Sequence, residues 1–226
     1  MRAYAEAAAA IEQSGLAAHG AFGLADDERQ GRLAEVATIA LVGLAGRRGW
    51  AAFAASPEAQ DGAADPLDRW SRRVIDGLAA ELGAVALYPF DGPPHWPFQR
   101  WARRAAPMHV SPLGLLIHPR DGLWRGYRGA LAFADRLAVP PPEAAASPCE
   151  ACIARPCLSA CPVGAFADAG YDVTACAGHL NHPAGRACMA GGCLARRACP
   201  IGAENAQQPA QAAFHMGAFL AAHRPA

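Results

Sequence analysis

Cysteine is the residue whose spacing in this chain most plainly suggests chemistry. All eight cysteines lie between Cys149 and Cys199, and the first 148 residues contain none. Thiolates are strong ligands of soft metals, so a dense cysteine segment indicates a metal or cluster site before other functions. The pattern reads Cys149-x2-Cys152-x4-Cys157-x3-Cys161-Pro162, then Cys176 alone, then Cys188-x4-Cys193-x5-Cys199-Pro200.

Three chemistries use closely spaced cysteines. Disulfides belong to oxidising compartments, which nothing in this chain suggests. Zinc usually takes paired C-x2-C knuckles, and only one is present here, although His179 and His182 lie nearby. In bacterial ferredoxins a Cys-Pro ends the cysteine run, and that cysteine ligates the other cluster. This chain has two Cys-Pro endings and eight cysteines, the number that two cubanes need, so the pattern favours two [4Fe-4S] clusters.

The cysteine segment also resembles a known family. The stretch from Cys149 to Phe166, read as CEAC…CLSACPVGAF, is similar to the ferredoxin-like module of epoxyqueuosine reductases and corrinoid reductive dehalogenases. Cys176 is similar to that family's lone cysteine, and the closing motif to its second cysteine run. In the family an α/β corrinoid-binding domain precedes the module, and the first part of this chain is distantly similar in the order of its elements.

The resemblance implies crossed ligation of the two clusters. One cluster would take Cys149, Cys152, Cys157 and Cys199, and the other Cys161, Cys176, Cys188 and Cys193. The sequence departs from the family's pattern in two ways. The stretch 153–156 widens the second gap beyond the family's C-x2-C-x2-C-x3-C-P. No Gly-Arg-Asp-Tyr stretch with the reductases' catalytic acid is found, and Asp65 and Asp68, which stand at that place in order, suit helix capping.

A second candidate site combines arginines with aromatic residues. Six arginines and a single acid, Asp121, lie between residues 99 and 128. Guanidinium groups beside aromatic rings suit a planar or anionic ligand, or else form a solvated rim around a core. We expect cofactor contacts from Trp124, Arg125, Tyr127 and Arg128. Three histidines offer either axial ligands to a corrinoid or ordinary turn residues: His95, His109 and His118.

Alternating helix and strand patterns must position these side chains. Helices are expected over Tyr4–Ala18, Asp65–Leu82, Phe98–Ala106 and Gln207–His223, and strands within Gly20–Leu24, Glu35–Leu44, Gly83–Phe90, Leu113–His118 and Leu131–Phe133. This alternation indicates an α/β class. We therefore expect an α/β domain over residues 1–139, a Pro/Ala-rich connector over 140–148, and a small ferredoxin-like two-cluster module over 149–226.

The amino-acid composition limits the classes of function that this chain can have. Twenty basic residues balance twenty acidic ones, and all the basic ones are arginine. Zero net charge argues against nucleic acid as a partner, and no long uncharged apolar run predicts a membrane span. Glu6 near the start argues against a secretion signal, so a cytoplasmic location is expected. The predicted function is iron–sulfur electron transfer to a partner protein or small-molecule acceptor. The alternative is a corrinoid-dependent reductase, with a corrinoid or flavin held by the first domain, so enzyme and carrier both stay open.

Overall fold

The computed structural model describes residues 3–167 and 170–223 and divides the chain into two compact units. The N-terminal unit combines Met1–Pro107 with Arg125–Ala144, and the C-terminal unit combines Met108–Trp124 with Ala145–Ala226. Residues 140–147, within the expected connector of residues 140–148, form no helix or strand. The division differs from the expected domain of residues 1–139, because residues 108–124 belong to the cysteine-rich unit.

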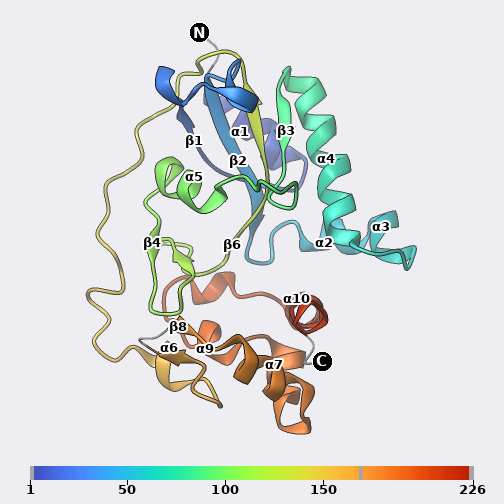
Figure 1. The fold of residues 1–226 in the computed structure, drawn as a ribbon, viewed down its shortest axis with the longest axis vertical. Helices are drawn as coiled ribbons and strands as arrows, with labels where there is room; N and C mark the ends of the chain where they lie inside the picture. Colours follow the sequence, from blue (N-terminus) through green and yellow to red (C-terminus); the bar gives the residue numbers. More distant parts are fainter. Residues whose placement is uncertain (1–2, 168–169, 224–226) are drawn as a thin grey trace. The chain divides into compact units, whose positions relative to one another are not determined.

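A four-stranded antiparallel sheet organises the N-terminal unit, in the order β1-β2-β6-β3 (Figure 1). The strands are β1 (Ala17–Gly23), β2 (Thr38–Ala45), β6 (Arg125–Phe133) and β3 (Val85–Leu87). All of β2 except its last residue is buried, as its unbroken apolar sequence predicts for a strand covered on both faces. The chain is therefore of mixed α/β class, with antiparallel pairing throughout this sheet.

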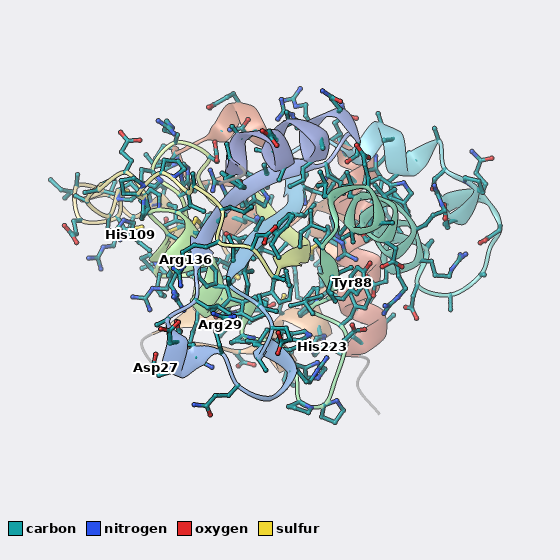
Figure 2. The ribbon with its side chains drawn as sticks, turned by 90° about the horizontal axis from the view of Figure 1, so that it is seen from above. Asp27, Arg29, Tyr88, His109, Arg136 and His223 are labelled. Atoms are coloured by element: carbon teal, nitrogen blue, oxygen red, sulfur yellow. The ribbon has the colours of Figure 1, made fainter. Side chains whose placement is uncertain are left out.

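Helices cover the sheet of the N-terminal unit. They are α1 (Tyr4–Gln13), α2 (Trp50–Ala54), α3 (Pro57–Gln60), α4 (Pro66–Leu82) and α5 (Phe98–Ala105), with 3-10 turns at Asp26–Glu28 and Gly31–Leu33. The longest, α4, packs on β6 and β3 through its apolar side, which includes Trp70, Ile75 and Leu82. Tyr88, labelled in Figure 2, follows β3 and donates a 2.6 Å hydrogen bond from its hydroxyl to Asp76 of α4.

The C-terminal unit is built from short elements. They are β4 (His109–Val110), β5 (Leu116–Ile117), α6 (Pro156–Ser159), β7 (Phe166–Ala167), β8 (Gly170–Tyr171), α7 (Val173–Asn181), α8 (Arg186–Gly191), α9 (Leu194–Arg197) and α10 (Pro209–Ala222), with 3-10 turns at Pro183–Gly185 and Ala203–Asn205. As expected, the C-terminal helix α10 docks on the unit, packing against α8 and α7. Among the described residues, no helix combines the length and apolarity needed to cross a membrane.

The hydrophobic core of the C-terminal unit explains why residues 108–124 belong to it. Leu113, Ile117 and Leu123 are buried in one cluster with Cys157 and Cys199. Without the 108–124 segment, those cysteines would lose the apolar side chains that shield them from water. The expected strand Leu113–His118 is accordingly only a two-residue strand, β5, paired with β4.

Candidate metal centre

Two cavities of the C-terminal unit divide the eight cysteines equally. The first quartet, Cys149, Cys152, Cys157 and Cys199, lines a small cavity of about 20 Å³ together with Leu113, Ile117, Leu123 and two Cys-flanking prolines, Pro156 and Pro200. Three of its members come from the start of the cysteine segment, and Cys199 comes from the residues just after α9. A cubane placed there would need the cavity walls to move outward, whereas the four sulfur donors already surround it.

The second quartet lines a larger cavity of about 220 Å³. Its members are Cys161, Cys176, Cys188 and Cys193. Cys176 projects from α7, Cys188 from α8, and Cys193 immediately precedes α9. Leu180, Phe166 and Met216 add apolar walls. The first quartet thus combines three early cysteines with the last one, Cys199, and the second combines Cys161 of the first run with three later cysteines. These are the two sets that the family resemblance implied.

The pKa directions of the thiols agree with this grouping. Burial raises the pKa of Cys149, and the negative charges of Cys199, Cys157 and Cys152 raise it further. Burial likewise raises the pKa of Cys176; a hydrogen bond from Tyr171 lowers it, and the negative charges of its three partners raise it further. The raised pKa values mean that ionising one thiol of a quartet opposes ionising the others, and a cationic metal group bound between them would favour the thiolate form.

Hydrogen bonds reach the sulfur atoms of the second quartet. The backbone N–H of Ala165 donates to Sγ of Cys161 at 3.3 Å. Nε2 of His179 lies 3.9 Å from Sγ of Cys188, and Tyr171 is hydrogen-bonded to Cys176. Donors of this kind stabilise thiolate ligands and tune the potential of iron–sulfur clusters.

Local backbone geometry explains the sequence signature after each Cys-Pro. Gly164 has φ of +59°, and this turn brings the N–H of Ala165 back to the sulfur of Cys161. Gly202 has φ of +65°, and a Cβ there would lie 2.4 Å from the backbone carbon of Asp121. Val163-Gly164-Ala165 follows the first Cys-Pro and Ile201-Gly202-Ala203 follows the second. The first glycine turns the chain back to a thiol, and the second lets two backbone segments lie in contact.

The widened gap between the second and third cysteines forms an exposed loop. Ile153 at its tip is 96% exposed. Arg155 adopts a left-handed conformation with φ of 39° and immediately precedes α6, which carries Cys157. The extra residues therefore bulge outward and leave Cys157 in the first quartet.

The chemistry that these donors can support differs between metals. All eight cysteines are free thiols in the structure. Among the described residues, no three His, Cys, Asp or Glu side chains lie together as a single metal ion requires. Zinc needs all its thiolates about 2.3 Å from one centre. A cubane takes each of its four thiolates on a different iron atom, so its ligands surround a wider space.

The predicted arginine–aromatic site is divided between the two units. Trp124 belongs to the C-terminal unit, whereas Arg125, Tyr127 and Arg128 lie on β6 of the N-terminal unit. Arg128 donates to the Ser71 hydroxyl at 2.9 Å and is also bonded to a carboxylate of α4, that of Asp68. Asp65 occupies the N-cap of α4 without a capping hydrogen bond. Much of the charge of Arg128 is therefore used within its own unit.

The three predicted histidines each bond to nearby backbone. Nδ1 of His95 lies 3.1 Å from the carbonyl oxygen of Asp91. Nε2 of His109 lies 3.0 Å from that of Ala145. The buried His118 accepts from the N–H groups of Arg120 and Asp121. These contacts are typical of histidines that order turns.

Several side chains beside the cysteines were not predicted from the sequence. Ser111, Leu113 and Arg155 line the cavity of the first quartet, and Tyr171 and Arg196 line that of the second. Leu113 and Ser111 are separated from the first cysteine by more than 35 residues in the chain. No local pattern marks them, since their position depends on how the 108–124 segment folds onto the cysteine-rich part.

Comparisons of this chain with protein-family models, with curated proteins and with solved structures gave no match.

Proposed function

We propose that this chain is an iron–sulfur electron-transfer protein whose C-terminal unit holds two [4Fe-4S] clusters. The observation that carries the proposal is the division of eight cysteines into two quartets, each around its own cavity. A cubane in each cavity would cycle by one electron, at a potential set by burial and by hydrogen bonds to sulfur. In this proposal the C-terminal unit is a ferredoxin-like two-cluster module.

The ligands follow the two quartets. Cys149, Cys152, Cys157 and Cys199 would hold the first cluster, and Cys161, Cys176, Cys188 and Cys193 the second. The chain's own residues would exclude water and orient the thiolates. Leu113 and Leu123 do so at the first quartet, and Leu180 at the second.

A corrinoid-dependent reductase is the alternative, with the N-terminal unit as the cofactor domain. Its predicted cofactor contacts on β6 are only partly available, because Arg128 is engaged by Asp68 and Ser71. Arg104 on α5 is similarly engaged by Glu28. The carrier proposal draws on the quartets alone and so needs no further ligand in that unit. A corrinoid or flavin spectrum in anaerobically purified protein would favour the reductase.

Replacing one cysteine from each quartet tests the proposal. The anaerobically reconstituted protein should contain about eight iron atoms and about eight sulfides per chain. Cys199→Ala should lose the first cluster and Cys176→Ala the second, so each variant should keep about four irons. Iron and sulfide analysis with EPR of the reduced protein measures this.

The matched control is Cys193→Ala, which stands close to Cys199 in sequence but in the other quartet. Its EPR signal should match that of Cys176→Ala. If it matched Cys199→Ala instead, the crossed ligation would be wrong. One zinc per chain without sulfide would end the iron–sulfur proposal.

A further inference from the structure

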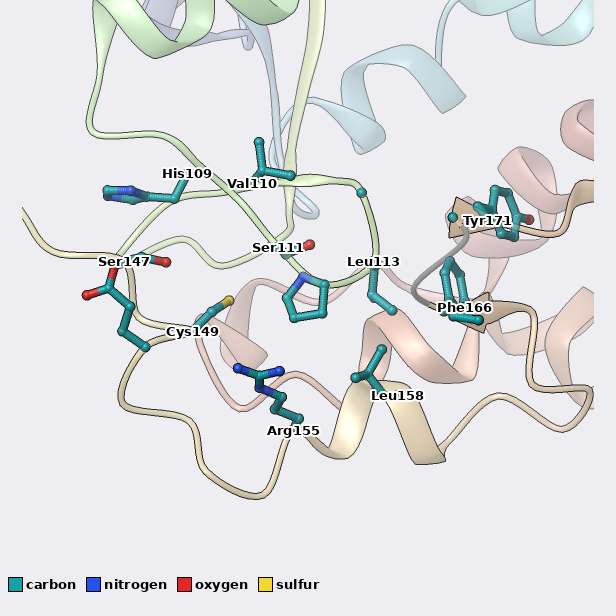
Figure 3. Close-up of a pocket in the computed structure, with 15 residues that line it drawn as sticks. His109, Val110, Ser111, Leu113, Ser147, Cys149, Arg155, Leu158, Phe166 and Tyr171 are labelled. Atoms are coloured by element: carbon teal, nitrogen blue, oxygen red, sulfur yellow. The ribbon is translucent and has the colours of Figure 1, made fainter.

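A third cavity of the C-terminal unit, of about 920 Å³, lies against the first quartet (Figure 3). Five residues line both this large cavity and the cavity of the first quartet: Ser111, Pro112, Leu113, Cys149 and Arg155. The two cavities therefore share part of their lining, which includes a predicted cluster ligand, Cys149. A molecule in the large cavity would lie within direct reach of the first cluster.

The large cavity also borders the second quartet, but less directly. Phe166 and Tyr171 line both this cavity and that of the second quartet. Their rings are stacked, with centroids 4.8 Å apart and planes 8° from parallel. No cysteine of the second quartet lines the large cavity, so the first cluster is the electron donor nearest to a bound molecule.

Two polar side chains stand on the shared wall: Ser111 is buried, whereas Arg155 is exposed to solvent. Ser111 is 6% exposed, and its hydroxyl has no hydrogen-bond partner in the structure. Leaving a buried hydroxyl unbonded is unfavourable, so its position points to an acceptor brought from outside the chain. Within the described part of the chain, no hydrogen bond or ion pair reaches the Arg155 guanidinium, and Figure 3 shows this side chain directed toward the wall that carries Ser111.

The remaining walls describe the ligand's chemistry. His109 and Ser147 are already engaged, by the Ala145 carbonyl and by Cys149 respectively. Apolar side chains cover much of the rest, including Leu113 and Leu158, which face one another in Figure 3. The volume is in the range that accepts a whole organic molecule. A guanidinium on an apolar wall suits an anionic group attached to a ring.

We propose that this cavity binds a redox-active ring compound bearing an anionic group, and that the first cluster passes it one electron. The electron half of this inference rests on the proposed function. The reduced cluster loses one electron, and the ring gains it and becomes a radical, without any bond being made or broken. Flavins and quinones share this chemistry, so both are tested.

The experiment uses the anaerobic, cluster-loaded full chain with two probes, flavin mononucleotide and anthraquinone-2-sulfonate, in equilibrium dialysis. At least one should bind, and which one binds identifies the flavin or the quinone source. Arg155→Gln should weaken binding about tenfold or more, since a charge-assisted bond is lost. Glu150→Gln, which removes the acid lining the same cavity, should not weaken it. Arg186→Gln, an exposed arginine lining none of the three cavities, is the matched control and should bind as the unmodified chain does.

A second variant separates the cavity from the first quartet. Leu158→Trp places a larger ring at the wall of the large cavity; Leu158 does not line the smaller cavity, although it packs against the core that includes Cys157 and Cys199. It should reduce binding while iron content stays at the level of the unmodified protein. If Leu158→Trp fails to fold, Arg155→Gln still tests the cavity, because it removes a charge without adding bulk. When the dithionite-reduced protein is mixed with the probe that binds, the first cluster should be oxidised before the second, as followed by freeze-quench EPR.

The outcomes separate the two proposals. Failure of both probes to bind a chain that holds about eight irons would overturn the cavity inference and leave the cluster proposal standing. Equal binding by Arg155→Gln and Arg186→Gln would also overturn it. A reconstituted chain without iron and sulfide would overturn the proposed function. If such a chain still bound a probe, the ligand site would stand and the electron transfer from the first cluster would not.

Discussion

Arg196 places a positive charge beside the second quartet. It lines that cavity, and the negative charge of Cys193 acts on it. Burial lowers the pKa of Arg196 to about 10, which leaves it protonated at neutral pH. Its guanidinium lies 4.5 Å from the ring centre of Trp124 and donates from Nε to the carbonyl oxygen of Leu123 at 3.0 Å.

We expect Arg196→Met to make the potential of the second cluster more negative. A nearby cation favours the added electron, so its removal should shift the potential on the order of tens of millivolts. A redox titration followed by EPR measures the shift for each cluster. Arg197→Met is the matched control, since Arg197 is exposed and donates to the Gly191 carbonyl on the surface. Equal shifts in both variants would contradict the assignment.

The spacing of the cysteines was visible in the sequence, but the positions of Arg196 and Arg155 beside the cavities were not. The cysteines could be proposed as metal ligands because such ligands are recognised in a sequence by their spacing. Arg196 could not, because its partner Leu123 is 73 residues away and neither residue belongs to a motif. In the sequence, Arg155 is only one residue of the widened gap between Cys152 and Cys157. In the structure its backbone is left-handed, and the residue lines two cavities.

At the scale of elements, local patterns were sufficient wherever a segment carries its own signal. The apolar period of α4 and the unbroken apolar run of β2 predicted a helix and a buried strand, and both predictions are confirmed. The first helix was predicted too long. It ends at Gln13, because Gly15 with φ of +86° turns the chain before β1. β6, which looked ambiguous beyond its last three residues, is a long inner strand fixed by pairing with β2 and β3.

The turn after Cys199 offers a test of how these elements hold a thiol. Gly202→Ala should destabilise the C-terminal unit and the first cluster, because the new Cβ would press into Asp121 backbone. Gly164→Ala should cost only about 1 kcal/mol, because its φ is positive but nothing lies within 4 Å of the added carbon. The rate at which a chelator removes iron, compared between the two variants, measures the difference. A faster loss in Gly164→Ala would show that contact with residues 121–122 is not what secures Cys199.

At the scale of the whole molecule, the two units have cores of different kinds. The N-terminal unit buries aliphatic side chains such as Ile39, Leu41 and Leu131. The core of the C-terminal unit includes Cys157 and Cys199 themselves. The sequence predicted two regions but not that residues 108–124 join the second, because this membership depends on distant contacts rather than on composition.

Iron removal should therefore affect the two units differently. In the proposed loaded form, removing the iron would leave eight thiols around cavities that water can enter, and the free energy of cluster binding would be lost from folding. We expect amide hydrogen exchange to accelerate in α8 and α9 and to stay slow in β2 and β6. Hydrogen-exchange mass spectrometry of loaded and stripped protein measures this. Equal acceleration in β2 would mean that the N-terminal unit does not hold its structure by itself.

The interleaving of the two quartets has a consequence for how the protein is made. Cys161 stands in the first cysteine run but lines the second cavity, and Cys199 stands last but lines the first. A ribosome releases residues in order, so the second quartet is incomplete until residue 193 has emerged and the first until residue 199. In the proposed loaded form, iron delivery to both sites thus falls after nearly the whole chain has been synthesised. A truncated chain ending before residue 193 would carry two incomplete sites, so cell-free synthesis of such fragments should yield chains that bind no stable cluster.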